Sequence, residues 1–435
     1  MKGKVAPKKG ANKTNTLIIN NKSLEKNYLT PFCFESKTLR EWCEFVKSYN
    51  PSNYRQIEIQ AVQCFSAIIA YCNQPNLPFF LLDISDSGTG KSRNKKFQFD
   101  ILFKPIQDEL DERFKGSGNK ELLAFLMENK ATYEGIYETA VNQPKFFTDL
   151  GEVGNALKNK DTKMQELLNM LTDKNGTNNT LKRPTYKNAK ALPPFVYNAK
   201  FYLAADTNLQ QLGGDDSVIK EYLGGLFNRF IIVYTKDVFS YENAKFNTNK
   251  PSYDEIAKFE SKIVDLMNFY KKESYEIDTN ALKQNENYDK FCRLIHSKKQ
   301  NKADEFKELY TRVVQNLNAI IQTLHYLNQY EISEDGGFKF NSKVADKTIN
   351  EAIKFIEPYT NLTLLFSEIN GQSEDIQNMR HKMLEYVKMQ IDKKGSCSIK
   401  DIAMNRAFRK YRTDDIRAIL KDFVMEEKRN LIILA

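Results

Sequence analysis

A short segment that joins a hydrophobic strand to a glycine-containing loop and a basic helix constrains this chain more than any other feature. The segment reads FFLLDISDSGTGKSRNKKF over residues 79–97. FFLLDI predicts a buried strand, and we expect a helix to begin at Lys91. Gly88 and Gly90 let the loop turn its backbone amides inward with no side chain in the way. This order of strand, loop and helix is typical of a phosphate-binding loop.

The loop predicts a site for ATP and Mg²⁺. We expect Lys91 to reach the β- and γ-phosphates, and the Ser92 hydroxyl to bind the metal. The positive end of the following helix would add to the attraction for phosphate. The usual motif begins with a glycine where this chain has Ser85, so a polar turn without nucleotide stays open as an alternative. The expected nucleotide-binding residues are Ser87, Gly88, Thr89, Gly90, Lys91 and Ser92.

Short hydrophobic strands alternate with helical stretches over residues 76–240, which we expect to form the ATPase domain. Such alternation predicts an α/β fold with a parallel sheet and crossover helices. The expected strands are 79–84, 145–149, 199–206 and 230–234.

Helical patterns precede and follow this domain. Ser36 is a plausible N-cap for a helix over 36–47, and a more buried helix is expected over 56–72. A stripe of apolar residues predicts a long helix over 303–327, and another is expected near 343–356. The expected division is a disordered basic tail (1–16), an N-terminal helical region (17–75), the ATPase domain (76–240), a helical domain (241–372) and a winged helix-turn-helix domain (373–435).

The last sixty residues or so carry a separate pattern of three helices and a closing strand. A helix is expected over 376–391, a second begins after Ser398 with Asp401 at capping-box spacing, and a third begins at Thr413. LIIL at 431–434 is expected to be a strand. Winged helices grip DNA or bind proteins. The sequence leaves both open, because basic residues precede the third helix while its own start is acidic.

An ATPase needs carboxylates near the phosphates, one for the metal shell and one to polarise the attacking water. In KFFTDLGEVGNAL, residues 145–157, Asp149 ends the expected strand and Glu152 follows three residues later. The usual adjacent Asp-Glu pair is therefore split. Either Gly151 and Glu152 take its place, or Asp149 serves the metal and Glu152 the water; we favour the second. Glu134 is the alternative base, and acids with only a turn role also stay open.

Two further polar residues adjoin expected strands. Asn208 follows the strand 199–206, and we expect it to hydrogen-bond the γ-phosphate or the water; a helix N-cap is the alternative. Arg229 stands between a Gly-Gly pair and the strand 230–234. It is expected to contact nucleotide, either within its own subunit or across a subunit interface as an arginine finger. A salt-bridged arginine at the start of a strand is equally open.

Composition excludes several classes of protein. Hydrophobic residues make up 41% of the 435 residues, which is enough for folded cores. The longest apolar stretches are strand-sized, so no membrane span is expected. The N-terminus lacks an apolar signal segment, and we expect a cytoplasmic protein. Cysteines without CxxC spacing and scattered histidines predict neither a disulfide framework nor a zinc site. The net charge of +9, concentrated in the N-terminal tail, suits contact with phosphodiester backbone or simple solubility.

Taken in order, five elements resemble a known family. They are the loop at 79–97, TYEGI, FFTDLGEVGNAL, FYLAADTNLQQLG and GGLFNRF. Together they are similar to P-loop ATPases of phages, plasmids and integrated mobile elements, a family largely of unknown function related to superfamily 3 and primase-helicase ATPases. The resemblance covers roughly residues 30–360. It implies a RecA- or AAA+-like core, assembly into a hexamer-type ring and DNA-dependent ATP hydrolysis.

Superfamily 3 enzymes carry a basic hairpin between the acidic and sensor strands. In that interval this chain has TLKRPTYKNAK, residues 180–190. Basic residues interleaved with an aromatic suit single-stranded DNA through phosphate pairing and base stacking. Lys182, Arg183 and Lys187 are therefore the expected DNA contacts, and an exposed basic loop is the alternative.

The sequence thus predicts an ATP-driven, ring-forming DNA helicase or replication initiator of a mobile genetic element. One alternative is an ATPase switch, in defence or partner remodelling, whose winged helix binds protein. A non-enzymatic DNA-binding scaffold with a decayed loop is the third hypothesis, supported only by Ser85 and the split acidic pair.

Overall fold

The computed structural model describes most of the chain between residues 31 and 433. The described residues are 31–50, 54–85, 90–113, 115, 125–128, 133–153, 181–182, 192–197, 199–207, 230–235, 250–300, 304–333, 340–370, 374–409, 411–420, 424–427 and 430–433. The chain divides between Ser367 and Glu368 into two compact units.

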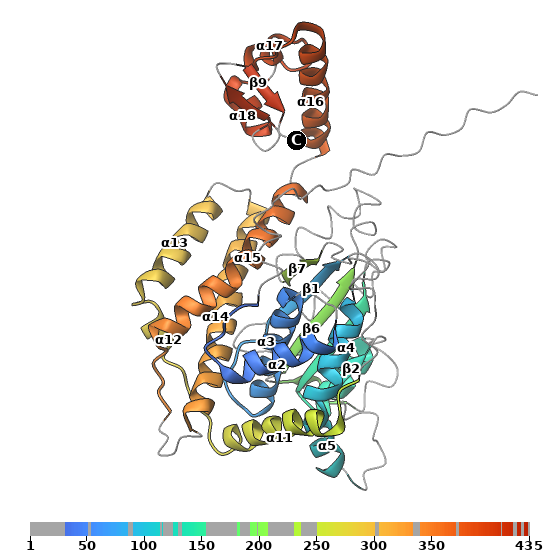
Figure 1. Ribbon diagram of the computed structural model, residues 1–435, viewed down its shortest axis with the longest axis vertical. Coiled ribbons are helices and arrows are strands. Elements are labelled where there is room, and N and C mark those ends of the chain that lie inside the picture. Colours follow the sequence, from blue (N-terminus) through green and yellow to red (C-terminus); the bar gives the residue numbers. More distant parts are fainter. Residues whose placement is uncertain are drawn as a thin grey trace, which may run out of the picture. The chain divides into compact units, whose positions relative to one another are not determined.

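A parallel sheet of five strands forms the centre of the larger unit (Figure 1). Its strand order is β2-β3-β6-β1-β7, so strands distant in sequence are neighbours in space. The strands are β1 (Phe80–Ser85), β2 (Leu126–Glu128), β3 (Lys145–Glu152), β6 (Lys200–Thr207) and β7 (Phe230–Thr235). The α/β class and four of these strands were expected from the sequence. β2, only three residues long, was not.

Side chains alternate between the two faces of this sheet, as the strand repeat requires. On β1, Leu81 belongs to a large apolar cluster formed mainly by helices, the first core. Phe80 and Leu82, on the opposite face, belong to a second apolar cluster that includes residues of α6 (Tyr133–Asn142). Phe147 on β3 and Tyr202 on β6 lie on the same face as Leu81. The sheet is therefore buried on both sides, and its strands read as nearly continuous hydrophobic runs.

The helices of the first core come from both ends of the unit. Trp42 of α2 (Lys37–Tyr49), Ile59 of α3 (Tyr54–Tyr71) and Phe99 of α4 (Lys91–Leu102) belong to one cluster with Phe259 and Tyr310 from later helices. Further helices of this core are α5 (Lys104–Arg113), α11 (Tyr253–Tyr270), α13 (Glu286–Gln300), α14 (Asp304–Ser333) and α15 (Asp346–Asn370), with the short α12 (Thr279–Leu282).

The helix α3 crosses the sheet with polar as well as apolar side chains buried. Gln63 donates to the carbonyls of Phe79 and Leu203, each 3.0 Å away, and so joins α3 to β1 and β6. Because buried amides must be hydrogen-bonded, these contacts fix where α3 lies on the sheet.

The start of α2 confirms the expected Ser36 cap, whose side chain accepts from the Leu39 amide. A second cap comes from far along the chain. The Glu331 carboxylate of α14 accepts from the Lys37 amide at 3.0 Å, the Thr38 amide at 2.8 Å and the Ser36 hydroxyl at 2.7 Å. An acidic group at a helix N-terminus satisfies free amides and the helix dipole, so Glu331 ties α2 to α14.

In the smaller unit, the described residues from Glu374 onward form three helices and a two-stranded antiparallel sheet. The expected capping box is confirmed, because the Asp401 amide donates to Ser398 Oγ and the Ser398 amide to the Asp401 carboxylate. The closing strand has a partner that the sequence did not reveal. The elements are α16 (Glu374–Lys394), α17 (Ile399–Met404), α18 (Thr413–Leu420), β8 (Val424–Glu427) and β9 (Asn430–Ile433).

A second small ladder in the larger unit pairs β4 (Leu181–Lys182) with β5 (Phe195–Val196) in antiparallel fashion. No helix among the described residues combines the length and hydrophobicity that crossing a bilayer requires.

Candidate functional site

Three aspartates gather at the carboxyl ends of three neighbouring strands. Asp83 of β1 and Asp206 of β6 are register partners, and both are buried. Asp149 of β3 pairs in register with Ala204, two residues before Asp206. Each of the three comes two residues after a strand residue that belongs to the first core, so all three lie on the face of the sheet that α3 and α4 cover. This edge is where parallel α/β sheets bind their ligands.

The helix α4 begins at this edge with Lys91, as the sequence predicted. Its N-cap, Gly90, has a φ of 79°, a left-handed conformation that favours glycine. The Lys91 ammonium donates to the carbonyl oxygens of Ser85 and Thr207, each 2.8 Å away. Lys91 therefore bridges the last residues of β1 and β6.

Ser85 occupies the position where the usual motif has its first glycine. Its hydroxyl donates to a carboxylate oxygen of Asp83, and its side chain is fully buried. The Gln56 amide of α3 donates to the other oxygen of Asp83. The Ser85 hydroxyl is therefore hydrogen-bonded to Asp83, while the Ser85 backbone carbonyl accepts from Lys91.

The Ser92 hydroxyl lies 3.4 Å from a carboxylate oxygen of Asp206, which makes a long hydrogen bond. Three residues further along α4, Lys95 reaches the same oxygen at 2.8 Å and Asp149 Oδ1 at 2.5 Å. Ser92 and Lys95 therefore share one acceptor on β6, and Lys95 links β6 to β3. The side chain of Lys95 is only 3% exposed.

Burial and charge act against each other in this cluster. Burial opposes the charged form of Lys95, but the two neighbouring carboxylates outweigh it and raise the pKa of the ammonium. Burial, helped by the charge of Asp149, raises the pKa of Asp206 even though the Lys95 ammonium acts to lower it. Burial, together with the charge of Asp206, also raises the pKa of Asp83. The acidic edge is thus an electrostatically costly arrangement, which Lys95 partly neutralises.

The expected acidic residues on β3 are separated by a bulge. The register with β6 shifts between Asp149 and Glu152, and Glu152 becomes the partner of Asp206. Gly151 lies in the bulge with a φ of 58°, and its amide donates to Asp149 Oδ1 at 2.9 Å. One extra residue therefore carries the backbone of Glu152 to the same edge as Asp206.

Several expected site residues lie outside the described part of the chain. Of Glu152, Glu134 and Lys182 the structure describes the backbone but not the side chain: Glu134 is in the first turn of α6, and Lys182 is in β4. The residues with no described position are Ser87, Gly88, Thr89, Arg183, Lys187, Asn208 and Arg229.

Sequence reasoning missed three residues that the structure brings to the site: Asp83, Lys95 and Asp206. A signal was available for each. Lys95 follows Lys91 by four residues, the spacing that places two side chains on one face of a helix. Asp83 and Asp206 each stand near the end of a hydrophobic strand. The sequence analysis assigned the polar role at the end of this strand to Asn208, two residues after Asp206.

The residues at this edge fit a magnesium-bound nucleotide. Mg²⁺ prefers hard oxygen ligands and keeps several waters and phosphate oxygens, so it needs few protein groups. Ser92 Oγ and the carboxylates of Asp149 and Asp206 are of this kind. Asp206 Oδ1 is buried and has no hydrogen-bond partner among the described residues. Within that same part of the chain, no cluster of three or more His, Cys, Asp or Glu side chains is arranged to hold a metal alone.

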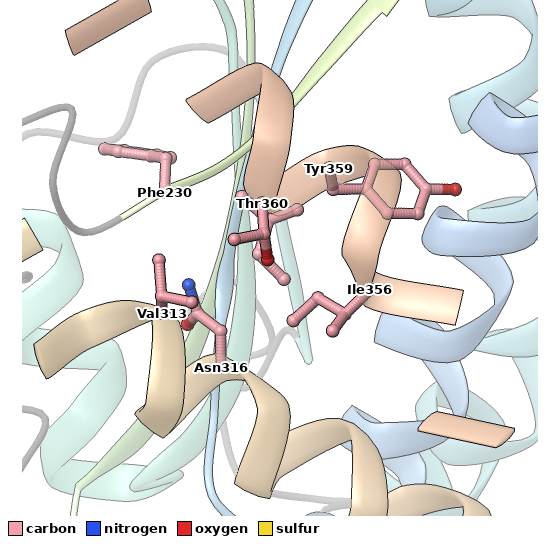
Figure 2. Close-up of a pocket in the computed structure, with 7 residues that line it drawn as sticks. Phe230, Val313, Asn316, Ile356, Tyr359 and Thr360 are labelled. Atoms are coloured by element: carbon pink, nitrogen blue, oxygen red, sulfur yellow. The ribbon is translucent and has the colours of Figure 1, made fainter. Parts of the chain in front are cut away.

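A small pocket lies away from this edge (Figure 2). It is bounded by Phe230 at the amino end of β7, by Val313 of α14 and by Ile356 and Thr360 of α15. Phe230 pairs in register with Phe80, the first residue of β1, so the pocket is at the opposite end of the strands from Lys91. Its mostly apolar lining marks it as a gap in packing between β7 and the helices.

Comparisons with known proteins add little to this geometry. No protein family model matches the chain, and no curated protein sequence matches it. A solved structure described as "SCCmec type IV Cch - active helicase" aligns with a TM-score of 0.36 and 11% identity, over 93% of this chain and 70% of that one. A similarity of this size carries no argument about fold or function.

Proposed function

We propose that this chain is a P-loop ATPase with a RecA- or AAA+-like core, which binds ATP with Mg²⁺ at the carboxyl edge of β1 and β6. The observation that carries the proposal is the position of Lys91 and Ser92. The ammonium of Lys91 donates to carbonyls at the ends of β1 and β6, and the hydroxyl of Ser92 lies 3.4 Å from Asp206. A cation, a hydroxyl and a helix N-terminus at one strand edge suit a bound polyphosphate.

The strand order supports this location. After β1 the chain moves toward β2 and β3 on one side of the sheet, and after β6 it crosses to β7 on the other. The gap between β1 and β6 is therefore the point where the connections leave in opposite directions. Open α/β sheets bind ligands at such a point.

The proposed roles follow from this placement. The loop from Ser87 to Gly90 would hold the phosphates, Lys91 would exchange its two carbonyl partners for phosphate oxygens, and Ser92 would hold Mg²⁺ together with Asp149 or Asp206. When bound, the magnesium ion neutralises charge on the phosphates. Glu152, whose backbone is opposite Asp206, is the proposed base that orients the attacking water, with Glu134 as the alternative.

Two further roles remain proposals. Asn208 is the residue after Thr207, the last residue of β6, and we propose that it hydrogen-bonds the γ-phosphate or the attacking water. Arg229 immediately precedes Phe230, the first residue of β7. Phe230 is at the amino end of β7, whereas Lys91 is at the carboxyl edge of the sheet. We propose that Arg229 contacts a neighbouring subunit's nucleotide as an arginine finger in a hexamer-type ring, and contact within its own subunit is the alternative.

We further propose that ATP hydrolysis drives action on DNA, as in a helicase or replication initiator of a mobile genetic element. Lys182, Arg183 and Lys187 would hold a single strand, and Lys182 begins this basic segment within the ladder of β4 and β5. The three helices and antiparallel hairpin of the smaller unit suit a winged helix-turn-helix domain. That domain binds either duplex DNA or a protein partner.

The test is ATP turnover with and without single-stranded DNA. Wild type should hydrolyse ATP faster when DNA is present, and a Lys182→Glu/Arg183→Glu variant should keep its basal rate but lose the stimulation. Lys91→Ala should lose both rates. Equal rates of ATP turnover by wild type with and without DNA would point instead to an ATPase switch with a protein partner. Absence of turnover in wild type would contradict the ATPase proposal and favour a DNA-binding scaffold.

A further inference from the structure

The buried ammonium of Lys95 lies between the carboxylates of Asp149 and Asp206. Binding of a nucleotide by the expected loop does not require these two contacts. The Nζ atom of Lys95 is 2.5 Å from Asp149 Oδ1 and 2.8 Å from Asp206 Oδ2. All three side chains are nearly inaccessible to water. An ion pair of this kind is removed from solvent, so its charges act on one another strongly.

The position of Lys95 on α4 follows from its spacing. It comes four residues after Lys91 and three after Ser92, so all three side chains share one face of the helix. Lys91 meets backbone carbonyls at the strand ends, whereas Lys95 meets carboxylates one turn deeper. The two lysines therefore have different partners and are suited to different tasks.

The carboxylates that Lys95 contacts have the character of metal ligands. Two buried aspartates on adjacent strands, without a cation between them, would repel each other and attract a divalent cation. Lys95 supplies that cation from within the chain. The ammonium and a divalent metal ion cannot both occupy the space between these oxygens without strong repulsion.

One oxygen of the pair is still free to bind a ligand. Asp206 Oδ1 is buried without a hydrogen-bond partner among the described residues, while Oδ2 serves both Lys95 and Ser92. An unpartnered buried carboxylate oxygen is costly, and it indicates that the site is completed by something that arrives later.

We propose that Lys95 is an internal counter-cation that keeps divalent metal ions away from the Asp149–Asp206 pair until the metal arrives bound to nucleotide phosphates. The nucleotide part of this statement rests on the proposed function. The exclusion of free metal is a property of the empty protein. Lys95 acts here as a positioning residue, because it acts through the two aspartates.

The test uses metal-free, nucleotide-free protein and Mn²⁺, whose unbound form is counted by electron paramagnetic resonance. Wild type and Lys95→Arg, which both keep the buried cation, should show no saturable binding. Lys95→Met should bind one Mn²⁺ saturably, at least about tenfold more tightly than the weakest binding that the measurement would detect in wild type, because the acidic pair has lost its counter-cation. The thermal midpoint of Lys95→Met, but not of wild type, should rise as Mn²⁺ is added.

Two controls keep the proposal open to contradiction. In the double variant Lys95→Met/Asp149→Asn the local charge matches wild type, so the gained Mn²⁺ binding should disappear. Equal Mn²⁺ binding by the double and single variants would overturn the proposal, as would no gain in Lys95→Met. Should Lys95→Met fail to fold, wild type decides: saturable Mn²⁺ binding that Asp206→Asn abolishes would overturn it, and no binding would support it. No nucleotide is present, so the result is independent of ATP turnover.

Discussion

Glu152 and Asp206 are register partners at the carboxyl ends of β3 and β6, while Asp149, three positions before Glu152, pairs with Ala204, only two positions before Asp206. The relationship depends on a bulge at Gly151, which adds one residue to β3 relative to β6. The two acidic residues of β3 are therefore separated in sequence because the strand contains a bulge between them. The bulge brings the backbone of Glu152 to the sheet edge at which α4 begins.

The bulge predicts that the stability cost of a substitution at Gly151 depends on whether the new residue can adopt a positive φ. The φ of 58° at Gly151 is a left-handed conformation that a β-branched residue adopts only with strain, whereas asparagine tolerates it. We expect Gly151→Val to lower the free energy of unfolding by about 1–3 kcal/mol, and Gly151→Asn to lower it by clearly less. Urea unfolding measures both. Equal losses in the two variants would show that space, rather than backbone conformation, selects glycine.

A second prediction concerns Asp206, which the sequence analysis did not select. Its carboxylate accepts from Lys95 and lies beside Ser92, so an amide there removes a charge next to the proposed metal. We expect Asp206→Asn to reduce the rate constant of ATP hydrolysis by about 10²-fold or more, with a smaller effect on the affinity for ATP.

The matched control for that experiment is Asp265→Asn, an exposed position on α11. Its turnover should equal that of wild type. Hydrolysis by Asp206→Asn at the wild-type rate would remove Asp206 from the site.

Glu351 predicts a dependence of stability on pH. Burial raises the pKa of its carboxyl group from 4.5 to about 7, while the Glu35 amide donates to it at 2.7 Å. The native state thus holds a proton that the unfolded state releases. The free energy of unfolding should fall as pH rises from about 4.5 to about 7, by up to about 3 kcal/mol from this group.

Glu351→Gln should remove that loss, because the amide keeps an acceptor for Glu35 and carries no charge. We expect the variant to be more stable than wild type near pH 8 and similar to it near pH 5. The exposed neighbour Glu357→Gln is the control and should change little at either pH. A variant equally stable to wild type at both values would show that Glu351 is not a buried, protonated acid.

The single tryptophan of the chain tests the packing of α2 against α4. Trp42 is fully buried, and its indole nitrogen donates to Gln98 Oε1 at 2.9 Å. Replacing the amide in Gln98→Leu leaves the buried indole N–H of Trp42 without its acceptor. We expect the free energy of unfolding to fall by about 1–3 kcal/mol. Denaturant unfolding monitored by the fluorescence of Trp42 measures this loss.

Gln315→Leu on the exposed side of α14 serves as the control, and its stability should stay within about 0.5 kcal/mol of wild type. A loss in Gln98→Leu no larger than in the control would mean that the hydrogen bond contributes nothing.

The sequence predicted the elements whose signals are local. Buried strands such as 230–234, the Ser36 cap and the capping box of Ser398 and Asp401 each depend on a few adjacent residues, and each is present. The strand β2 was missed because three residues give no periodicity to detect.

The partners of the site residues were less accessible to sequence reasoning. The contact of Lys95 with Asp149 and Asp206 joins α4, β3 and β6, and it depends on the strand order of the sheet. A linear pattern contains no such information. The helix spacing of Lys91 and Lys95 could have placed both at one edge, but not the acids that Lys95 meets.

The central claim is that ATP with Mg²⁺ binds where α4 meets the ends of β1 and β6. Isothermal titration with Mg²⁺ and a slowly hydrolysed ATP analogue tests it most directly, in wild type, in Lys91→Ala and in the exposed control Lys283→Ala. The account predicts saturable binding by wild type and Lys283→Ala, and at least tenfold weaker binding by Lys91→Ala. Equal affinity in all three proteins, or none in wild type, would contradict it.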